Sequence, residues 1–293
     1  MTSIATPTAN STWMWRGHQI NYQTAGDTGA AVLLIHGFGA SVGHWRKNLP
    51  VLAANCRCYA IDLIGFGGSD KPQPSEIEYT FETWATQVVD FCREIIGAPT
   101  ILVGNSIGCI VALQAAVTSP ETVRGIALLN CSLRLLHDRK RAAMPFYRRW
   151  GTPILQSVLT VPAIGKFFFK QLAQPQVVGK ILRQAYHRPE AVTAELIEIL
   201  MAPAADAGAA DVFLKFTAYS WGPLPEDLLP QLTCPAIAIW GAADPWEPIA
   251  LGRELMNVAT VDEFVELPNV GHCPQDEAPE LVNPVLQQWI AKL

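Results

Sequence analysis

The chain has 293 residues, 50% of them hydrophobic, and a formal net charge of −5. This length allows a large buried core, arranged either as two domains or as one α/β domain with an insertion. The negative charge argues against a general nucleic-acid-binding protein, and no run of 18 apolar residues is present that would predict a transmembrane span.

The seven cysteines are odd in number and scattered through apolar stretches. This is typical of reduced, buried thiols rather than of a disulfide framework. No second cysteine pair completes Cys56-x-Cys58 to a zinc site, so no metal is expected. Residues 1–11 lack the basic and apolar regions of a secretory signal. We therefore expect a cytoplasmic protein, either soluble or peripheral on a membrane.

Strand and helix patterns alternate in the first half of the chain. Two short strands, joined by Arg16-Gly17, are predicted at 12–15 and 19–23. Continuous apolar runs predict buried strands at 31–35, 58–61, 101–105 and 123–129. Apolar residues at helical spacing predict helices at 42–53, 80–96 and 109–119. Thr80 is the expected N-cap of the second of these helices.

The same alternation resumes near residue 235. Strands are predicted at 235–240 and 264–267, and helices at 249–256 and 279–291. This order predicts an α/β fold with a mostly parallel sheet and helices on both faces. Between the two parts the sequence contains no buried-strand run and is broken by prolines. We interpret 133–225 as a helical cap inserted into a core formed by 1–132 and 226–293.

The predicted cap is strongly basic over 133–188. Eleven Lys and Arg residues stand against the single Asp138, a net charge of +10, which leaves −15 for the rest of the chain. Large aromatic residues are mixed with these cations. Such a segment suits a lid that contacts an anionic lipid surface, and equally an ordinary amphipathic cap whose aromatic residues line a pocket.

The stretch 101–108 carries the most specific chemical signal. A buried strand runs into Gly104-Asn105-Ser106-Ile107-Gly108, a G-x-S-x-G motif, and a helix follows at once. This context presents the serine on a strained turn at the top of a sheet, where only glycines fit beside it. Ser106 is therefore the predicted nucleophile.

A serine hydroxyl needs a base within hydrogen-bond reach, and histidine has a suitable pKa. Of six histidines, His272 lies in a Gly-His-Cys-Pro loop after the last predicted strand. Asp244 follows the preceding strand and would fix the histidine tautomer, which gives the order Ser, Asp, His. The rival position after the 123–129 strand holds Asn130, which carries no charge to stabilise an imidazolium.

An oxyanion hole needs two donors, and we assign them to the backbone amides of Ile107 and Phe38. Phe38 lies in His36-Gly37-Phe38-Gly39, directly after the first buried strand. His36, Asp62 and Ser69 are interpreted as residues that brace the surrounding loops. Further predicted pocket residues are Trp45, Asn105 and Trp246.

These motifs resemble the α/β-hydrolase superfamily along the full length of the chain. The residues that carry the resemblance are H-G-F-G at 36–39, D-L-I-G-F-G-G-S at 62–69, G-N-S-I-G at 104–108, G-A-A-D at 241–244 and G-H at 271–272. The resemblance implies an eight-stranded sheet, acyl-enzyme chemistry and no cofactor. Haloalkane dehalogenases and epoxide hydrolases share the first two motifs but use an aspartate nucleophile, whereas position 106 here is serine.

A finer resemblance concerns the segments 104–109, 130–137 and 240–248, which look like the pheophytinase and chlorophyll dephytylase group of photosynthetic organisms. That group hydrolyses the phytyl ester of chlorophyll pigments. It implies a small-molecule, apolar ester as substrate and a location on or near a photosynthetic membrane. Any other long-chain ester would suit an aromatic-rich cap as well.

Other functions remain open. A generic carboxylesterase, a carbon–carbon bond hydrolase of ring-cleavage products and a cofactor-free perhydrolase all use the same triad. The second of these acts on small acidic dienones and needs a cation in its pocket. A non-catalytic homologue that binds a ligand or protein through its cap is the alternative from another class. The sequence gives no oligomeric state.

Overall fold

The computed structural model describes residues 8–143 and 161–293. One sheet of eight strands runs through this part of the chain, in the order β1-β2-β4-β3-β5-β6-β7-β8. The strands are β1 (Ala9–Trp15), β2 (His18–Ala25), β3 (Ala30–Ile35), β4 (Cys56–Ile61), β5 (Thr100–Asn105), β6 (Val123–Leu129), β7 (Ala236–Gly241) and β8 (Val261–Leu267). Strand β2 pairs antiparallel with both β1 and β4, and all other neighbours are parallel. The predicted mostly parallel, eight-stranded sheet is confirmed.

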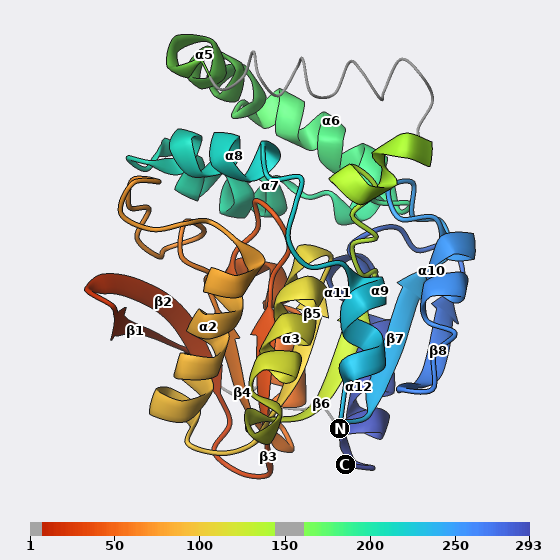
Figure 1. Cartoon of the computed structure of the whole chain (residues 1–293). Helices are drawn as coiled ribbons and strands as arrows, with labels where there is room; N and C mark the ends of the chain where they lie inside the picture. The colour runs from red at the N-terminus through yellow and green to blue at the C-terminus, as the bar shows by residue number, and fades with distance from the viewer. Residues whose placement is uncertain (1–7, 144–160) are drawn as a thin grey trace.

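Helices cover both faces of this sheet (Figure 1). One hydrophobic cluster joins the sheet to α2 (Phe81–Phe91), α3 (Ile107–Thr118), α9 (Pro225–Leu228) and α10 (Ile249–Leu255). A second cluster, on the opposite face, includes α1 (Leu49–Leu52) and α12 (Pro279–Ile290). The central strands β3, β5 and β7 are buried along nearly their whole length, because helices lie on both sides of them.

Local sequence explains most helix boundaries. The Thr80 side chain accepts a hydrogen bond from the Thr83 amide, so the predicted N-cap begins α2. The helix continues as a π-helical turn over Cys92–Ile96 and ends at Gly97, which adopts a positive φ of 69°.

The helix predicted for 42–53 is wrong as one element. A 3₁₀ turn covers Val42–Trp45, and α1 begins anew at Leu49. Pro50 lacks an amide proton and is tolerated only in the first turn of a helix, so a continuous helix through it is disfavoured.

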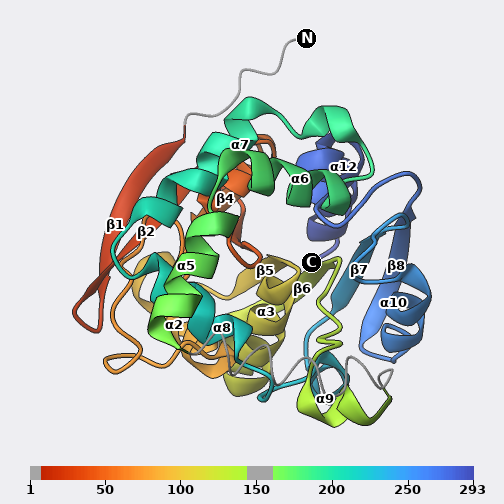
Figure 2. The same ribbon diagram turned by 90° about the horizontal axis from the view of Figure 1, so that it is seen from above.

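A helical cap lies over the carboxyl ends of the strands (Figure 1). Its described helices are α5 (Pro162–Leu172), α6 (Pro175–Ala185), α7 (Ala194–Met201) and α8 (Ala209–Thr217). Helices α7 and α8 form the layer nearer the sheet, and α5 and α6 form the outer layer. In the view from above, α5 and α8 lie toward the β1–β2 edge, and β8 lies at the opposite edge (Figure 2). These helices lie between β6 and β7, where the sequence predicts a cap, and the division at 132/133 and 225/226 stays a prediction.

None of the described helices is both long and apolar enough to cross a membrane. All seven cysteines lie within the described residues and are free, and six of them are buried.

Candidate active site

Ser106 lies between the end of β5 and the first residue of α3. Its backbone is in a strained conformation, with φ 55° and ψ −118°, which side-chain-bearing residues rarely adopt. Contacts on both sides hold this turn, because the Ser106 amide donates to Leu129 O at 3.0 Å and the Ser106 carbonyl accepts from Ser132 N at 3.2 Å. The strain is therefore stabilised by β6 and the segment that follows it.

The glycines of the G-x-S-x-G motif are required by close packing. A Cβ added to Gly104 would lie 2.5 Å from the backbone of Gly108, and one added to Gly108 would lie 2.4 Å from Ile35 O. Both approaches involve backbone atoms that cannot move aside. The space needed for this turn thus exists only because neither residue has a side chain.

His272 and Asp244 are joined by a hydrogen bond at the carboxyl end of the sheet. His272 Nδ1 lies 2.7 Å from Asp244 Oδ2, and both side chains are buried. The other oxygen, Asp244 Oδ1, accepts from the amides of Trp246 and Glu247. This bond fixes Nδ1 as the protonated nitrogen of a neutral ring, so Nε2 is left to act as an acceptor.

Two asparagines hold this pair, and sequence reasoning missed what each does. Asn130 Nδ2 donates to Asp244 Oδ2 at 2.7 Å, and its Oδ1 accepts from Gly241 N. Asn105 Nδ2 donates to His272 O and to Leu129 O, both at 3.1 Å. The only sequence signal for Asn130 is its place directly after a buried strand, which is the position where a rival acid would lie.

The cap also contacts the histidine loop directly. His272 N donates to Ala185 O, at the end of α6, at 2.8 Å. A Cβ on Gly271 would lie 2.2 Å from the same carbonyl oxygen. The glycine before the histidine therefore allows a cap helix to fix the position of the imidazole.

Phe38 and Ile107 carry the backbone amides that the sequence predicts as oxyanion donors. Neither backbone amide donates a hydrogen bond to any described residue. Ile107 is the first residue of α3, where amide protons have no partner within the helix. Gly37, next to Phe38, packs so closely on Ser106 that an added Cβ would lie 3.2 Å from the serine Cβ. Both free amides thus lie beside the serine.

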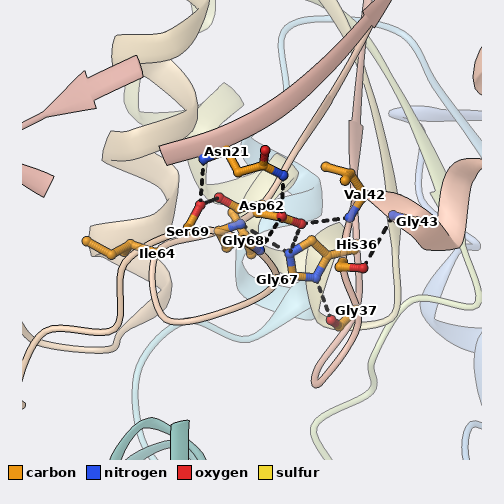
Figure 3. Close-up of polar contacts among 12 residues, drawn as sticks. Asn21, His36, Gly37, Val42, Gly43, Asp62, Ile64, Gly67, Gly68 and Ser69 are labelled. Carbon is orange, nitrogen blue, oxygen red and sulfur yellow. Dashed lines mark hydrogen bonds and ion pairs between the residues drawn. The ribbon is translucent and has the colours of Figure 1, made fainter. Parts of the chain in front are cut away.

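A buried network holds the loop that carries Phe38 (Figure 3). Asp62 accepts from Asn21 Nδ2, Val42 N and Gly68 N, each at 2.7 Å. His36 Nε2 accepts from Leu63 N at 3.1 Å, so its Nδ1 donates to Gly37 O at 2.7 Å. Burial lowers the pKa of His36, which keeps the ring neutral. His36 and Asp62 therefore brace the loop, as the sequence indicated.

Ser106 and His272 line one cavity of about 550 Å³, here called the Ser106 cavity. Trp246 lines it as well, with its ring centroid 5.0 Å from that of His272, and so does Asn105. No hydrogen bond joins Ser106 Oγ to His272 among the contacts of the described residues. The cap contributes side chains to its walls, namely Leu136, Val178, Ile181, Leu182, Ala185 and Leu200.

Trp45 does not line the Ser106 cavity, so that prediction is wrong. Its side chain is fully buried in the hydrophobic cluster on the α1 and α12 face of the sheet. A tryptophan near a glycine-rich loop fits a pocket and a core equally well, and the turn at Val42–Trp45 directs this one into the core.

A second cavity, about 350 Å³, adjoins the first and is here called the apolar chamber. The two share six wall residues, Phe38, Gly39, Ala40, Val178, Ile181 and Leu200. Beyond these, apolar side chains of the cap form most of the chamber, including Phe169, Leu172, Met201 and Phe213. Lys71, the one cation among the described residues that line it, pairs with Asp206 at 2.8 Å and donates to two backbone carbonyls. The described walls of the chamber therefore contain no unpaired charge that could bind a charged ligand.

Glu247 and His44, which line the Ser106 cavity, have shifted pKa values. Burial raises the pKa of Glu247 to about 7, although Ser132 Oγ and Leu133 N donate to its carboxylate. Burial lowers the pKa of His44 to about 4. His44 Nε2 lies 2.9 Å from the Tyr186 hydroxyl, which itself donates to Asp276. Neither residue was predicted, because their burial depends on contacts distant in sequence.

The sheet order, the strained serine turn and the histidine–aspartate pair together define an α/β-type hydrolase. A model of the alpha/beta hydrolase family matches residues 32–285, and the chain belongs to this family.

Relatives cover nearly the whole chain. Chloroplastic pheophytinase of Arabidopsis thaliana is 26% identical, over 99% of this chain and 68% of its own length. The uncharacterized hydrolase YugF of Bacillus subtilis (strain 168) is 27% identical, over 94% of this chain and 95% of its own. A solved structure of CarC, a serine hydrolase involved in carbazole degradation, superposes with a TM-score of 0.77 at 19% identity, covering 98% of this chain and 100% of that one. At this sequence identity, the similarity to the CarC structure shows only a shared fold.

Proposed function

We propose that this protein is a serine hydrolase of carboxylic esters and that Ser106, His272 and Asp244 are its catalytic triad. The observation that carries the proposal is the arrangement at the Ser106 cavity. A serine held at φ 55° on the strand-to-helix turn lines the same cavity as a histidine already bonded to a buried aspartate. Hydrogen bonds in an empty site are often long and tighten when substrate binds, so the serine–histidine bond is expected in the complex.

In the proposed reaction, Ser106 Oγ attacks the ester carbonyl carbon as His272 Nε2 takes the hydroxyl proton. The carbonyl oxygen becomes an oxyanion and accepts hydrogen bonds from the amides of Phe38 and Ile107. Asp244 stabilises the imidazolium that forms. Collapse of the intermediate breaks the ester C–O bond, and His272 returns its proton to the leaving alcohol.

Water then completes the cycle. His272 takes a proton from water, whose oxygen attacks the acyl carbon on Ser106. The second intermediate collapses to release the carboxylic acid, and the proton returns to Ser106 Oγ.

The favoured substrate is an ester with a bulky apolar part, with the phytyl ester of a chlorophyll or pheophytin pigment preferred. The apolar chamber continues the Ser106 cavity and gives a hydrocarbon chain a place beside the reacting carbonyl. Each buried CH₂ group contributes roughly 0.8 kcal/mol, so a chain of about twenty carbons gains a large binding free energy. The similarity to Arabidopsis pheophytinase supports the choice of a phytyl chain.

The second candidate is a carbon–carbon bond hydrolase of ring-cleavage products, which the sequence leaves open because such enzymes use the same triad. Such a substrate is a small acid and calls for a cation in the pocket. The described walls of the Ser106 cavity contain no lysine or arginine, and they do contain the Glu247 carboxylate. This charge pattern favours a neutral ester over an acidic dienone.

The test is a substrate series for the wild-type protein and Ser106→Ala. The series runs from short p-nitrophenyl esters through long-chain esters to pheophytin, with a dienone acid beside them. We expect ester hydrolysis that rises with chain length in the wild type and none in Ser106→Ala, with equal unfolding transitions for both. Turnover retained in Ser106→Ala, or a folded wild type that hydrolyses no ester, would contradict the proposal and favour a non-catalytic binding protein.

A further inference from the structure

The outer layer of the cap exposes apolar side chains to solvent. On α5, Phe167 is 65% exposed and Ile164, one helical turn before it, is 46% exposed. Val161, directly before this helix, is 47% exposed. Residues three apart lie on the same side of a helix, so these side chains form one apolar stripe. Exposed apolar side chains gathered in this way indicate a contact surface.

Cations flank this stripe. The segment 161–188 contains Lys166, Lys170, Lys180, Arg183 and Arg188 and no acidic residue. Lys166 pairs with Asp211 at 3.2 Å and Arg188 pairs with Glu280. Among the described residues, no carboxylate pairs with the other three. Their charge is therefore free to attract an anionic surface.

A further hollow adjoins the apolar chamber and includes two of these lysines in its walls. This hollow of about 370 Å³ shares Phe169, Ala173, Met201 and Ala204 with the chamber, and its two lysines are Lys166 and Lys170. Asp206 and Asp211 also line it and pair with Lys71 and Lys166. The cavities thus follow one another from Ser106 to a hollow between α5 and the segment 201–211.

We propose that the α5–α6 face, defined by residues 161–185, docks on the surface of an anionic lipid bilayer. The apolar stripe enters the boundary between head groups and acyl chains, and Lys170, Lys180 and Arg183 contact lipid phosphates. A hydrocarbon substrate dissolved in the bilayer then enters the apolar chamber at the hollow on α5 without crossing water. This last step rests on the proposed ester hydrolase function, whereas the docking itself does not.

The experiment is cosedimentation of the full chain with vesicles of phosphatidylcholine alone or phosphatidylcholine with phosphatidylglycerol, at low and high salt. The test variant is Lys180→Gln/Arg183→Gln, because both side chains are exposed on α6 and line neither cavity. The matched control is Lys292→Gln/Arg124→Gln, which removes one lysine and one arginine at the opposite end of the sheet. Phe167→Ser tests the apolar stripe.

We expect the wild type to bind the anionic vesicles at low salt and to dissociate at high salt. Each cation at an anionic surface is worth about a fivefold change in affinity, so the α6 variant should bind roughly 25-fold more weakly. The control variant should bind like the wild type, and Phe167→Ser should bind more weakly. Equal loss in the two double variants, equal binding to both vesicle types or no binding at low salt would overturn the proposal.

Sedimentation velocity without lipid tests the competing occupant, a second copy of this chain. A dimer that Lys180→Gln/Arg183→Gln dissociates would make the face a protein interface and overturn the docking proposal, and a monomer supports docking. Ser106→Ala separates the two proposals, since docking predicts wild-type vesicle binding for this variant. Charge-dependent vesicle binding without any ester hydrolysis would contradict only the proposed function. Ester hydrolysis without vesicle binding would contradict only the docking on a lipid bilayer.

Discussion

Asn130 Nδ2 and His272 Nδ1 both lie 2.7 Å from the same oxygen, Oδ2 of Asp244. The two donors come from the loops after β6 and β8, and the acceptor comes from the loop after β7, which lies between them. The carboxylate thus has a fixed orientation before any substrate binds. A neutral amide at position 130 supports the acid at 244 and does not replace it.

This geometry predicts graded effects of two substitutions. Asp244→Asn should lower kcat by about 10⁴-fold, because an amide cannot stabilise the imidazolium and favours the wrong tautomer. Asn130→Ala should lower kcat by about tenfold, since the loss of one hydrogen bond to a charged group is worth roughly 1.5–3 kcal/mol, only part of which reaches the transition state. Steady-state kinetics on one ester checks both. Equal losses for the two variants would contradict the supporting role of Asn130.

Gly108→Ala should destabilise the fold, by roughly 1–3 kcal/mol or more, because the new methyl group would lie 2.4 Å from Ile35 O. Gly179→Ala in α6 is the control, because there the nearest atoms are side-chain ends at 3.2 Å. Alanine is the better helix former by about 1 kcal/mol, so the control should be neutral or stabilised. Urea unfolding measures the stability of both variants. A stabilised Gly108→Ala would show that the turn at Ser106 has room for a side chain at position 108.

Glu247 makes stability depend on pH. Its folded-state pKa of about 7 lies above the ordinary value of 4.5, so the folded state binds the extra proton. Its contribution is therefore fully present below about pH 4.5 and is lost as the pH rises to about 7, by up to about 3 kcal/mol. Glu247→Gln removes this dependence. The urea midpoint of the variant minus that of the wild type should therefore be larger at pH 8 than at pH 5.

His44 acts in the opposite direction over a similar range. Its pKa is lowered to about 4, so the stability that depends on its neutral form is lost as the pH falls from about 6.5 to 4. Wild type and Glu247→Gln must therefore be compared at each pH, because the contribution of His44 then cancels in the difference. Parallel pH profiles for the two proteins would contradict the account of Glu247.

The apolar chamber predicts a change in chain-length preference. Ala204 lies where the chamber meets the hollow on α5, so Ala204→Trp should fill this region. We expect kcat/KM for long-chain esters to fall at least tenfold, with little change for short esters. Ala207→Trp is the control, since Ala207 is exposed nearby and lines neither cavity. Equal effects on short and long esters would show that the chamber does not hold the chain.

The sequence predicted those features that a single segment determines. The strained turn at Ser106 is set by a strand, two glycines and a helix that are contiguous in the chain, and its geometry follows from them. The same holds for Thr80, whose side chain caps the helix that it precedes.

Features that depend on distant segments were not predictable in this way. The bond from His272 N to Ala185 O joins the cap to the histidine loop, and nothing near either residue signals it. The prediction that Trp45 lines the pocket is wrong for the same reason. Its loop position and residue type do not reveal in which direction the turn points the side chain. Phe146, Tyr147 and Trp150, which are aromatic residues of the predicted cap, lie outside the described residues.

The most direct test of the central claim is covalent labelling by a fluorophosphonate probe, followed by peptide mass spectrometry. The account predicts one adduct, on Ser106, in the wild-type protein, and its loss in Ser106→Ala. His272→Ala should be labelled at a rate lower by several orders of magnitude, because the hydroxyl then has no base. A folded wild type without an adduct on Ser106, or undiminished labelling in His272→Ala, would contradict the claim that this histidine activates this serine.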